Sequence, residues 1–243
     1  MINLSIVIPC YNEGRNIPRL INRINRIIDR CKINLQFIIV NNGSSDNTNA
    51  LLTNLIKNKY KKFYKIIFIK KNIGYGGGIL KGIFFSTGKI VAWTHADLQT
   101  DPYDIIKAYK KYFKKILNDK MIVKGLRENR KIFDKIFTHF MSFICYVIFK
   151  LRIKDINAQP KIFNRSFLKL LKKAPKDFSL DLFLLLVALN NNYTISNYPV
   201  ILQNRIYGNA KGGGSFIGKF RLSIKTLAYM IKLKKYGYSN TQN

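Results

Sequence analysis

The segment "KIVAWTHADLQTDP" (residues 89–102) joins an apolar, strand-like run to a cluster of polar side chains. "KIVAW" is typical of a buried strand, and the acidic residue Asp97 comes just beyond its end. A carboxylate there is a ligand that Mg²⁺ and Mn²⁺ prefer, and Gln99 offers a second oxygen on the same side. The alternative is that Asp97 caps the helix expected to begin at Pro102. His95, two residues before Asp97, adds an imidazole to the cluster.

The same strand-then-polar pattern recurs through the first half of the chain. Strand-like runs at 4–10, 35–40, 64–70, 89–93 and 121–125 alternate with helical patterns. This alternation predicts an α/β fold, a Rossmann-like, open, mostly parallel sheet with helices on both faces. Ligands of such sheets bind beyond the carboxyl ends of the strands, so one edge is expected to hold one site. The polar residues that fall there are Tyr11, Asn12, Glu13, Asn41, Asn42, Gly43, Ser44, His95 to Gln99, and Arg127.

The pattern changes after about residue 126. Residues 131–151 predict a long apolar helix with basic residues, and 155–167 mix turn and strand signals before another helix. Residues 193–200 are strand-like, and a basic, glycine-rich loop follows at 204–215. We therefore expect one main domain over residues 1–215, and a C-terminal helix with a polar tail over residues 216–243.

The charge is strongly unbalanced: 43 Lys and Arg against 12 Asp and Glu, a net charge of +31 over 243 residues. Such a chain attracts nucleic acid, anionic lipid and phosphorylated substrates. Biased codon usage in an AT-rich genome is the alternative source of the lysines. No DNA- or RNA-binding motif is visible, so we expect no nucleic-acid partner.

Several features predict a cytoplasmic protein. The three cysteines lack metal or redox spacing, and the chain enters a strand-like run at once, without a signal peptide. No apolar run reaches the roughly 18 residues that a membrane span needs. The helix expected over 131–151 has a broad apolar face beside lysines, which suits peripheral contact with the anionic inner face of a membrane. An ordinary core or dimer helix fits the same pattern, and the sequence does not give the oligomeric state.

Six motifs in order resemble family 2 glycosyltransferases of the GT-A fold, and most closely their polyprenyl-phosphate sugar synthase branch. The similarity covers residues 3 to about 165 well and the last quarter weakly. The motifs are "SIVIPCYNE" (5–13), "FIIVNNGSSDNT" (37–48), "GYGGGILKG" (74–82), "VAWTHADLQTDP" (91–102), "GLRENR" (125–130) and "RIYGNAKGGG" (205–214).

The resemblance implies an inverting, metal-dependent glycosyltransferase. It would move a sugar from a nucleotide-sugar donor to polyprenyl phosphate or to a cell-surface glycan precursor, with Mg²⁺ or Mn²⁺ as cofactor. Asp97 matches the second acid of the family's Asp-x-Asp motif, and Gln99 matches a further metal ligand. Arg205 and Lys211 match a basic loop that closes over phosphates. The donor-binding residues implied are Pro9, Tyr11, Asn12, Glu13, Asn41, Asn42, His95, Ala96, Arg205 and Lys211.

Two positions depart from the family pattern. His95 replaces the first acid of the motif; it can bind the metal through nitrogen, bond to the donor or water, or simply pack. Asn41 and Asn42 stand where the family has paired aspartates, which leaves the nucleoside base open; a plain turn is the alternative. The "GYGGG" segment could also present N–H groups to a phosphate at a helix start.

The acceptor decides whether a catalytic base is needed. A hydroxyl nucleophile needs a positioned carboxylate, whereas a lipid phosphate is already anionic at neutral pH. Asp155 is the first candidate base and Asp181 the second, with structural hydrogen bonding as the alternative role. We therefore predict Asp97, Asp155 and Arg127 as catalytic residues and Asp97, Gln99 and His95 as metal ligands. A degenerate, non-catalytic module that binds a nucleotide or a polyanion is the competing function.

Overall fold

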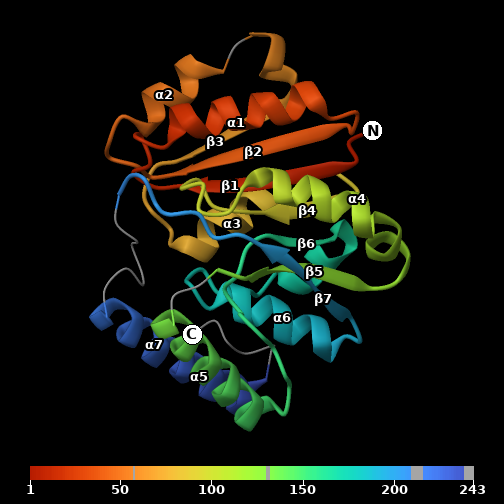
Figure 1. Cartoon of the computed structure of the whole chain (residues 1–243), viewed down its shortest axis with the longest axis vertical. Helices are drawn as coiled ribbons and strands as arrows, with labels where there is room; N and C mark the ends of the chain where they lie inside the picture. Colours follow the sequence, from red (N-terminus) through yellow and green to blue (C-terminus); the bar gives the residue numbers. More distant parts are fainter. Residues whose placement is uncertain (57, 130–131, 209–215, 238–243) are drawn as a thin grey trace.

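The computed structural model describes residues 1–56, 58–129, 132–208 and 216–237 (Figure 1). The carboxyl edge predicted to hold the site belongs to one seven-stranded sheet with the strand order β3-β2-β1-β4-β6-β5-β7. Its strands are β1 (Leu4–Cys10), β2 (Leu35–Asn42), β3 (Tyr64–Ile69), β4 (Ile90–Trp93), β5 (Met121–Arg127), β6 (Lys161–Asn164) and β7 (Thr194–Val200).

Most strand pairs are parallel, as the alternating pattern predicts. β1 pairs in parallel with β2 and β4, β2 with β3, and β5 with β7. The exception is β6, which runs antiparallel to both β4 and β5. Since β6 has only four residues, the mixed turn and strand signal of 155–167 did not reveal its direction.

Helices cover both faces of the sheet, which confirms the predicted layers. The helices are α1 (Ile17–Arg30), α2 (Thr48–Leu55), α3 (Tyr75–Phe84), α4 (Pro102–Asn118), α5 (Ile132–Phe149), α6 (Leu180–Asn190) and α7 (Phe216–Tyr236), with short 3₁₀ helices η1 (Asn58–Phe63) and η2 (Arg165–Leu171). Side chains alternate across each strand: Ile6 and Ile8 pack in the core with α1, α2 and α4, whereas Val7 packs in the core with α3 and α6. Burial on both faces explains the continuous apolar strand runs.

α5 and α7 lie side by side beyond α6, at the bottom of Figure 1. Met230 and Leu233 of α7 are buried in the same core as α6, so this helix contributes to the main core. Phe140 and Phe143 of α5 and Phe220 of α7 are more than half exposed. None of the described helices is long and apolar enough to cross a bilayer.

Candidate active site

The loops after β1 and β2 are joined by hydrogen bonds at the carboxyl edge of the sheet. Asn12 adopts a positive φ of 53°. Its backbone N–H donates to Ser44 Oγ (2.9 Å), and its Oδ1 accepts from Ser45 N (2.8 Å). Glu13 N donates to Thr48 Oγ1 (3.0 Å) in the same way. These contacts bring the two predicted nucleoside-binding segments, 9–13 and 41–44, to one place.

Asn41 and Asn42 have different environments. Asn42 is buried, its Nδ2 donates to Asn72 Oδ1 and Gly74 O (3.2 and 2.9 Å), and its Oδ1 accepts from Ile73 N. Asn42 therefore holds the loop before α3 against β2. Asn41 Oδ1 accepts from Ser44 N (3.1 Å), and its Nδ2 has no hydrogen bond among the described residues. Of the two, Asn41 is the one with a donor left for a ligand.

Asp97, Gln99 and Arg205 converge beyond β4. One guanidinium nitrogen of Arg205, Nη2, donates to Asp97 Oδ2 (2.6 Å) and to Gln99 Oε1 (3.0 Å). The backbone supports this contact, since Gln203 N donates to Gln99 O (2.8 Å). The Asp97 side chain is 6% exposed and that of Arg205 21%, so the ion pair is largely shielded from water. Two side-chain oxygens thus face one positive charge.

Asp101, and not Asp97, is the cap of α4. Its Oδ1 accepts from Tyr103 N (2.9 Å), and its carboxylate pairs with Arg23. The capping role that the sequence allowed for Asp97 is therefore filled four residues later. Asp97 Oδ1 instead accepts from Gln99 N (3.1 Å), which fixes the turn that carries both side chains.

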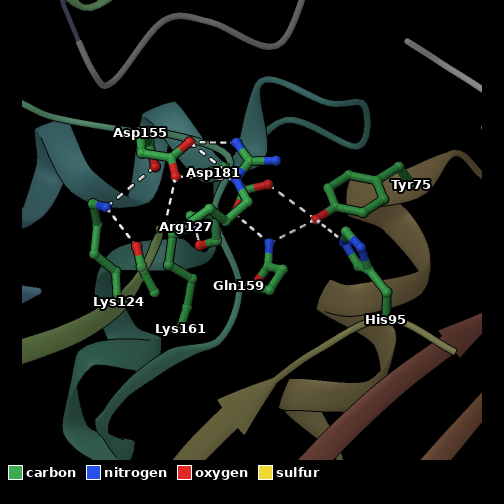
Figure 2. A network of polar contacts seen from close by, with 10 residues as sticks. Tyr75, His95, Lys124, Arg127, Asp155, Gln159, Lys161 and Asp181 are labelled. Carbon is green, nitrogen blue, oxygen red and sulfur yellow. Dashed lines mark hydrogen bonds and ion pairs between the residues drawn. The ribbon is translucent and has the colours of Figure 1, made fainter. Parts of the chain in front are cut away.

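His95 contacts a polar network that continues into the interior (Figure 2). Its Nε2 lies 3.1 Å from Tyr75 Oη, and the two rings meet edge to face. Tyr75 Oη also donates to Asp181 Oδ2 (2.9 Å) and accepts from Gln159 Nε2 (3.1 Å). Asp181 Oδ1 in turn pairs with the fully buried Lys161 Nζ at 2.7 Å. The predicted alternative base, Asp181, is thus a buried, paired carboxylate.

A second part of the network fixes Arg127. Asp155 accepts hydrogen bonds from the Arg127 backbone N–H (3.0 Å), Nε and Nη2, which engages both carboxylate oxygens. Lys124 Nζ donates to the carbonyls of Asp155 and Gly125. Asp155 thus anchors and orients Arg127 with both carboxylate oxygens, and its role as a base stays a prediction.

Burial shifts several pKa values in this network. Desolvation and the nearby Lys161 lower the pKa of Lys124 to about 7, and desolvation also lowers that of Lys161. Burial and the Asp181 carboxylate raise the pKa of Tyr75 well above its ordinary value. Tyr75 therefore keeps its proton at physiological pH and stays a hydrogen-bond donor.

The "GYGGG" segment at the start of α3 packs against protein. Gly77 N donates to Lys176 O (2.8 Å). A Cβ on Gly76 would lie 2.5 Å from Pro175 O, and one on Gly74, whose φ is +88°, would lie 2.4 Å from Lys176 O. These glycines let the segment before α6 approach the helix start. That segment covers it, and this disfavours the phosphate cradle that the sequence suggested.

The remaining predicted residues differ in exposure. Pro9 and Tyr11 are partly exposed at the end of β1, and Glu13 Oε2 accepts from Asn16 Nδ2 (2.6 Å). Ala96 is buried in the core. Lys211 lies outside the described residues.

The model of the family described as glycosyl transferase family 2 matches residues 5–169 of this chain. The chain belongs to this glycosyltransferase family. The match spans every strand of the sheet except β7 and includes all the polar clusters up to β6.

Curated relatives of this chain carry names from the polyprenyl-phosphate branch. A dolichyl-phosphate beta-glucosyltransferase of Dictyostelium discoideum is 32% identical over 133 residues, 53% of this chain and 41% of the relative. One of Trichomonas vaginalis is 26% identical over 215 residues, 82% of this chain and 65% of the relative. A dodecaprenyl-phosphate galacturonate synthase of Rhizobium johnstonii is 27% identical over 178 residues, 70% of this chain and 50% of the relative. The chain spans between 41% and 65% of these relatives' lengths.

Solved structures share the fold. Glucosyl-3-phosphoglycerate synthase of Mycobacterium tuberculosis, in complex with Mn²⁺, UDP and phosphoglyceric acid, superposes with a TM-score of 0.71 at 14% identity. The match covers 96% of this chain and 78% of that one. The same synthase with Mg²⁺ and UDP gives a TM-score of 0.66 at 13% identity, covering 95% of this chain and 78% of that one. The expected GT-A architecture is confirmed.

Four members of the polar network that connects His95, Asp181 and Arg127 were not identified from the sequence (Figure 2). Lysines inside the strand-like runs "MIVKG" and "QPKIF" were a usable signal, because a lysine among apolar strand residues must be buried with partners. Tyr75 and Gln159 gave no such signal, since their partners lie 106 and 22 residues away. The four missed residues are Tyr75, Lys124, Gln159 and Lys161.

The donor atoms of this site suit a hard divalent cation. No cluster of three or more His, Cys, Asp or Glu side chains that could hold a metal occurs within the described part of the chain. Asp97 and Gln99 nevertheless direct two oxygens toward one cationic nitrogen. Mg²⁺ and Mn²⁺ commonly take one or two protein oxygens and complete their shell with phosphate oxygens and water. The residues present fit that pattern.

Proposed function

We propose that this glycosyltransferase moves a sugar from a nucleotide-sugar donor to a polyprenyl phosphate, with Mg²⁺ or Mn²⁺ as cofactor and inversion at the sugar carbon. The names of the relatives support a polyprenyl-phosphate acceptor, and a fold neighbour crystallised with UDP-glucose supports a nucleotide-sugar donor. The crystallisation of a fold neighbour with Mn²⁺ and UDP supports the cofactor.

The observation that carries the proposal is the convergence of Asp97 Oδ2 and Gln99 Oε1 on Arg205 Nη2, at 2.6 and 3.0 Å. These oxygens hold a positive charge at the carboxyl end of β4, where α/β sheets bind ligands. When bound there, a divalent ion would neutralise the charge that develops on the departing nucleoside diphosphate.

The basic residues have complementary roles in the proposal. Arg205 exchanges its contact with Asp97 for the phosphates of the donor, so binding of donor and cation releases its guanidinium. Arg127 is already oriented by Asp155 and offers a planar fork toward a phosphate. Asn41 donates its amide N–H to the base, and Tyr11 lines the nucleoside pocket.

The contacts of the two candidate bases, Asp155 and Asp181, favour a lipid-phosphate acceptor. Arg127 engages the oxygens of Asp155. Asp181 Oδ1 pairs with Lys161, and Asp181 Oδ2 accepts from Tyr75. An acceptor hydroxyl would need a base, whereas a phosphate monoester, with a second pKa of about 6, is already a nucleophile at neutral pH. The proposed step then depends on positioning of the reactants.

The outer surface of α5 and α7 suits a membrane-bound acceptor. We propose that the exposed Phe140, Phe143 and Phe220, beside the basic residues of α7, dock on anionic lipid at the cytoplasmic face. Replacing Phe140 and Phe143 by serine should weaken co-sedimentation with phosphatidylglycerol vesicles several-fold. Equal sedimentation of this double variant and the wild type would contradict the docking surface.

A thermal-shift screen with UDP, GDP and dTDP, each with and without Mn²⁺, tests the donor site. One nucleotide should raise the melting temperature, and only when Mn²⁺ is present. Transfer from the matching nucleotide sugar to a short polyprenyl phosphate is then measured for the wild type and for Asp97→Ala. Asp119→Ala, which removes an exposed acid at the other end of α4, is the matched control. Nucleotide binding without any turnover would favour the non-catalytic module.

A further inference from the structure

The replacement of the family's first acid by His95 raises the question of which ring nitrogen faces the donor site. His95 Nε2 is 3.1 Å from Tyr75 Oη, while Nδ1 has no hydrogen bond among the described residues. Figure 2 shows the Tyr75 hydroxyl between His95 and Asp181. The direction in which the Tyr75 hydroxyl donates its proton determines which tautomer of the His95 imidazole is favoured.

The hydrogen-bond partners of Tyr75 determine which of them receives the single hydroxyl proton. Asp181 Oδ2 lies 2.9 Å from the hydroxyl, and a carboxylate can only accept. Gln159 Nε2 lies 3.1 Å from the hydroxyl and 2.9 Å from Asp181 Oδ1, so this amide nitrogen donates to both. Tyr75 therefore gives its proton to Asp181 and is left with acceptor capacity toward His95.

The carboxylate of Asp181 is held in place by an ion pair. Lys161 Nζ is 2.7 Å from Oδ1, and both side chains are almost completely buried. The Tyr75 ring is held as well, since it stacks on Phe178 with ring centroids 4.7 Å apart and an angle of 10°. The Tyr75 hydroxyl oxygen is therefore held in position beside His95 Nε2, as a hydrogen-bond acceptor.

We infer that Tyr75 is a positioning residue that holds His95 as the Nε2–H tautomer, so that Nδ1 keeps its lone pair and serves as a nitrogen ligand to the cation bound by Asp97 and Gln99. The cation part of this inference rests on the proposed function; the tautomer part does not. A nitrogen in place of a carboxylate removes one negative charge from the site and favours Mn²⁺ over Mg²⁺.

The tautomer is measurable without metal or substrate. The chain has only two histidines, His95 and His139, so ¹⁵N-histidine labelling gives two imidazole systems, and His139→Gln assigns them. At a pH of about 8, where imidazoles are neutral, long-range ¹H–¹⁵N spectra distinguish the protonated from the lone-pair nitrogen. We expect His95 to have a protonated Nε2 with a slowly exchanging N–H signal, and an unprotonated Nδ1.

The variant Tyr75→Phe keeps the stacked ring and removes only the acceptor. The protected Nε2–H signal should then be lost and both tautomers populated. Tyr64→Phe is the matched control, because it removes a partly buried tyrosine hydroxyl that bonds Asn25. A protonated Nδ1 in the wild type, or the same protected signal in Tyr75→Phe, would overturn the inference. The wild-type spectrum decides the point even if Tyr75→Phe folds poorly.

The ligand role is tested by pulsed electron paramagnetic resonance on the protein with Mn²⁺ and the nucleoside diphosphate. A ¹⁴N coupling should be present in the wild type and absent in His95→Asp, and the ratio of Mn²⁺ to Mg²⁺ affinity should fall about tenfold or more in that variant. Bound Mn²⁺ without a ¹⁴N coupling would overturn nitrogen ligation. Failure of Mn²⁺ to bind at all would overturn the proposed function, while the tautomer result is obtained independently.

Discussion

Replacing Arg205 by alanine is expected to tighten the binding of Mn²⁺ alone and to weaken the binding of a nucleoside diphosphate together with Mn²⁺. In the present structure the guanidinium bonds Asp97 Oδ2 at 2.6 Å and Gln99 Oε1 at 3.0 Å, so a cation must displace it. A charged hydrogen bond with this little exposure contributes about 1.5–3 kcal/mol. Since about 1.4 kcal/mol corresponds to tenfold, Mn²⁺ affinity should rise about 10- to 100-fold.

Loss of the free Mn²⁺ paramagnetic resonance signal on titration measures this affinity directly. Arg165→Ala is the matched control, because it removes one exposed positive charge elsewhere and reports the general effect of net charge. The nucleotide affinity, measured by calorimetry at saturating Mn²⁺, should fall in Arg205→Ala because a phosphate contact is lost. If Mn²⁺ alone binds Arg205→Ala no more tightly than Arg165→Ala, the two oxygens are not the cation site.

Three further predictions concern the interior. Asp181→Asn should lower the unfolding free energy by about 3–5 kcal/mol in denaturant titrations, because it leaves Lys161 buried without a charged partner; adding Lys161→Met should recover most of the loss. The melting temperature should rise from pH 7 towards pH 9, because the unfolded chain keeps a proton that Lys124, with its pKa lowered to about 7, loses when folded; Lys124→Met should make this rise smaller, while the lowered pKa of Lys161 still contributes to it. Gly76→Ala should cost about 1–3 kcal/mol, since its Cβ would lie 2.5 Å from Pro175 O; unchanged stability would contradict the close packing there.

Much of the fold could be predicted because the central parallel strands β1, β2 and β4 are buried on both faces and are therefore continuous apolar runs. The runs at 4–10 and 35–40 correspond to β1 and to all but the last two residues of β2. The reversal at β6 could not be predicted, since four residues between a turn and a 3₁₀ helix carry no directional signal. The sequence also did not indicate that α7 would share a core with α6 through Met230 and Leu233.

Site residues could be predicted where a polar side chain directly follows the end of a strand. Asp97 and Gln99 follow β4 directly, whereas the contact of Asp97 with Arg205 joins residues 108 positions apart and was not predicted. The family resemblance implied only that Arg205 lies in a loop that closes over phosphates. The role of Asp155 could not be read from its surroundings in the sequence, because its partner Arg127 lies 28 residues earlier on β5. The sequence presents Asp155 as a candidate base, and only the structure shows that its carboxylate pairs with Arg127.

Anomalous scattering from crystals grown with Mn²⁺ and the nucleoside diphosphate chosen by the thermal-shift screen tests the central claim most directly. We predict one manganese peak bonded to Asp97 Oδ2 and Gln99 Oε1, at the roughly 2.1–2.3 Å typical of small oxygen-bound cations, with Arg205 moved onto the phosphates. A nucleotide bound with the Asp97–Arg205 ion pair intact and no manganese between Asp97 and Gln99 would contradict it.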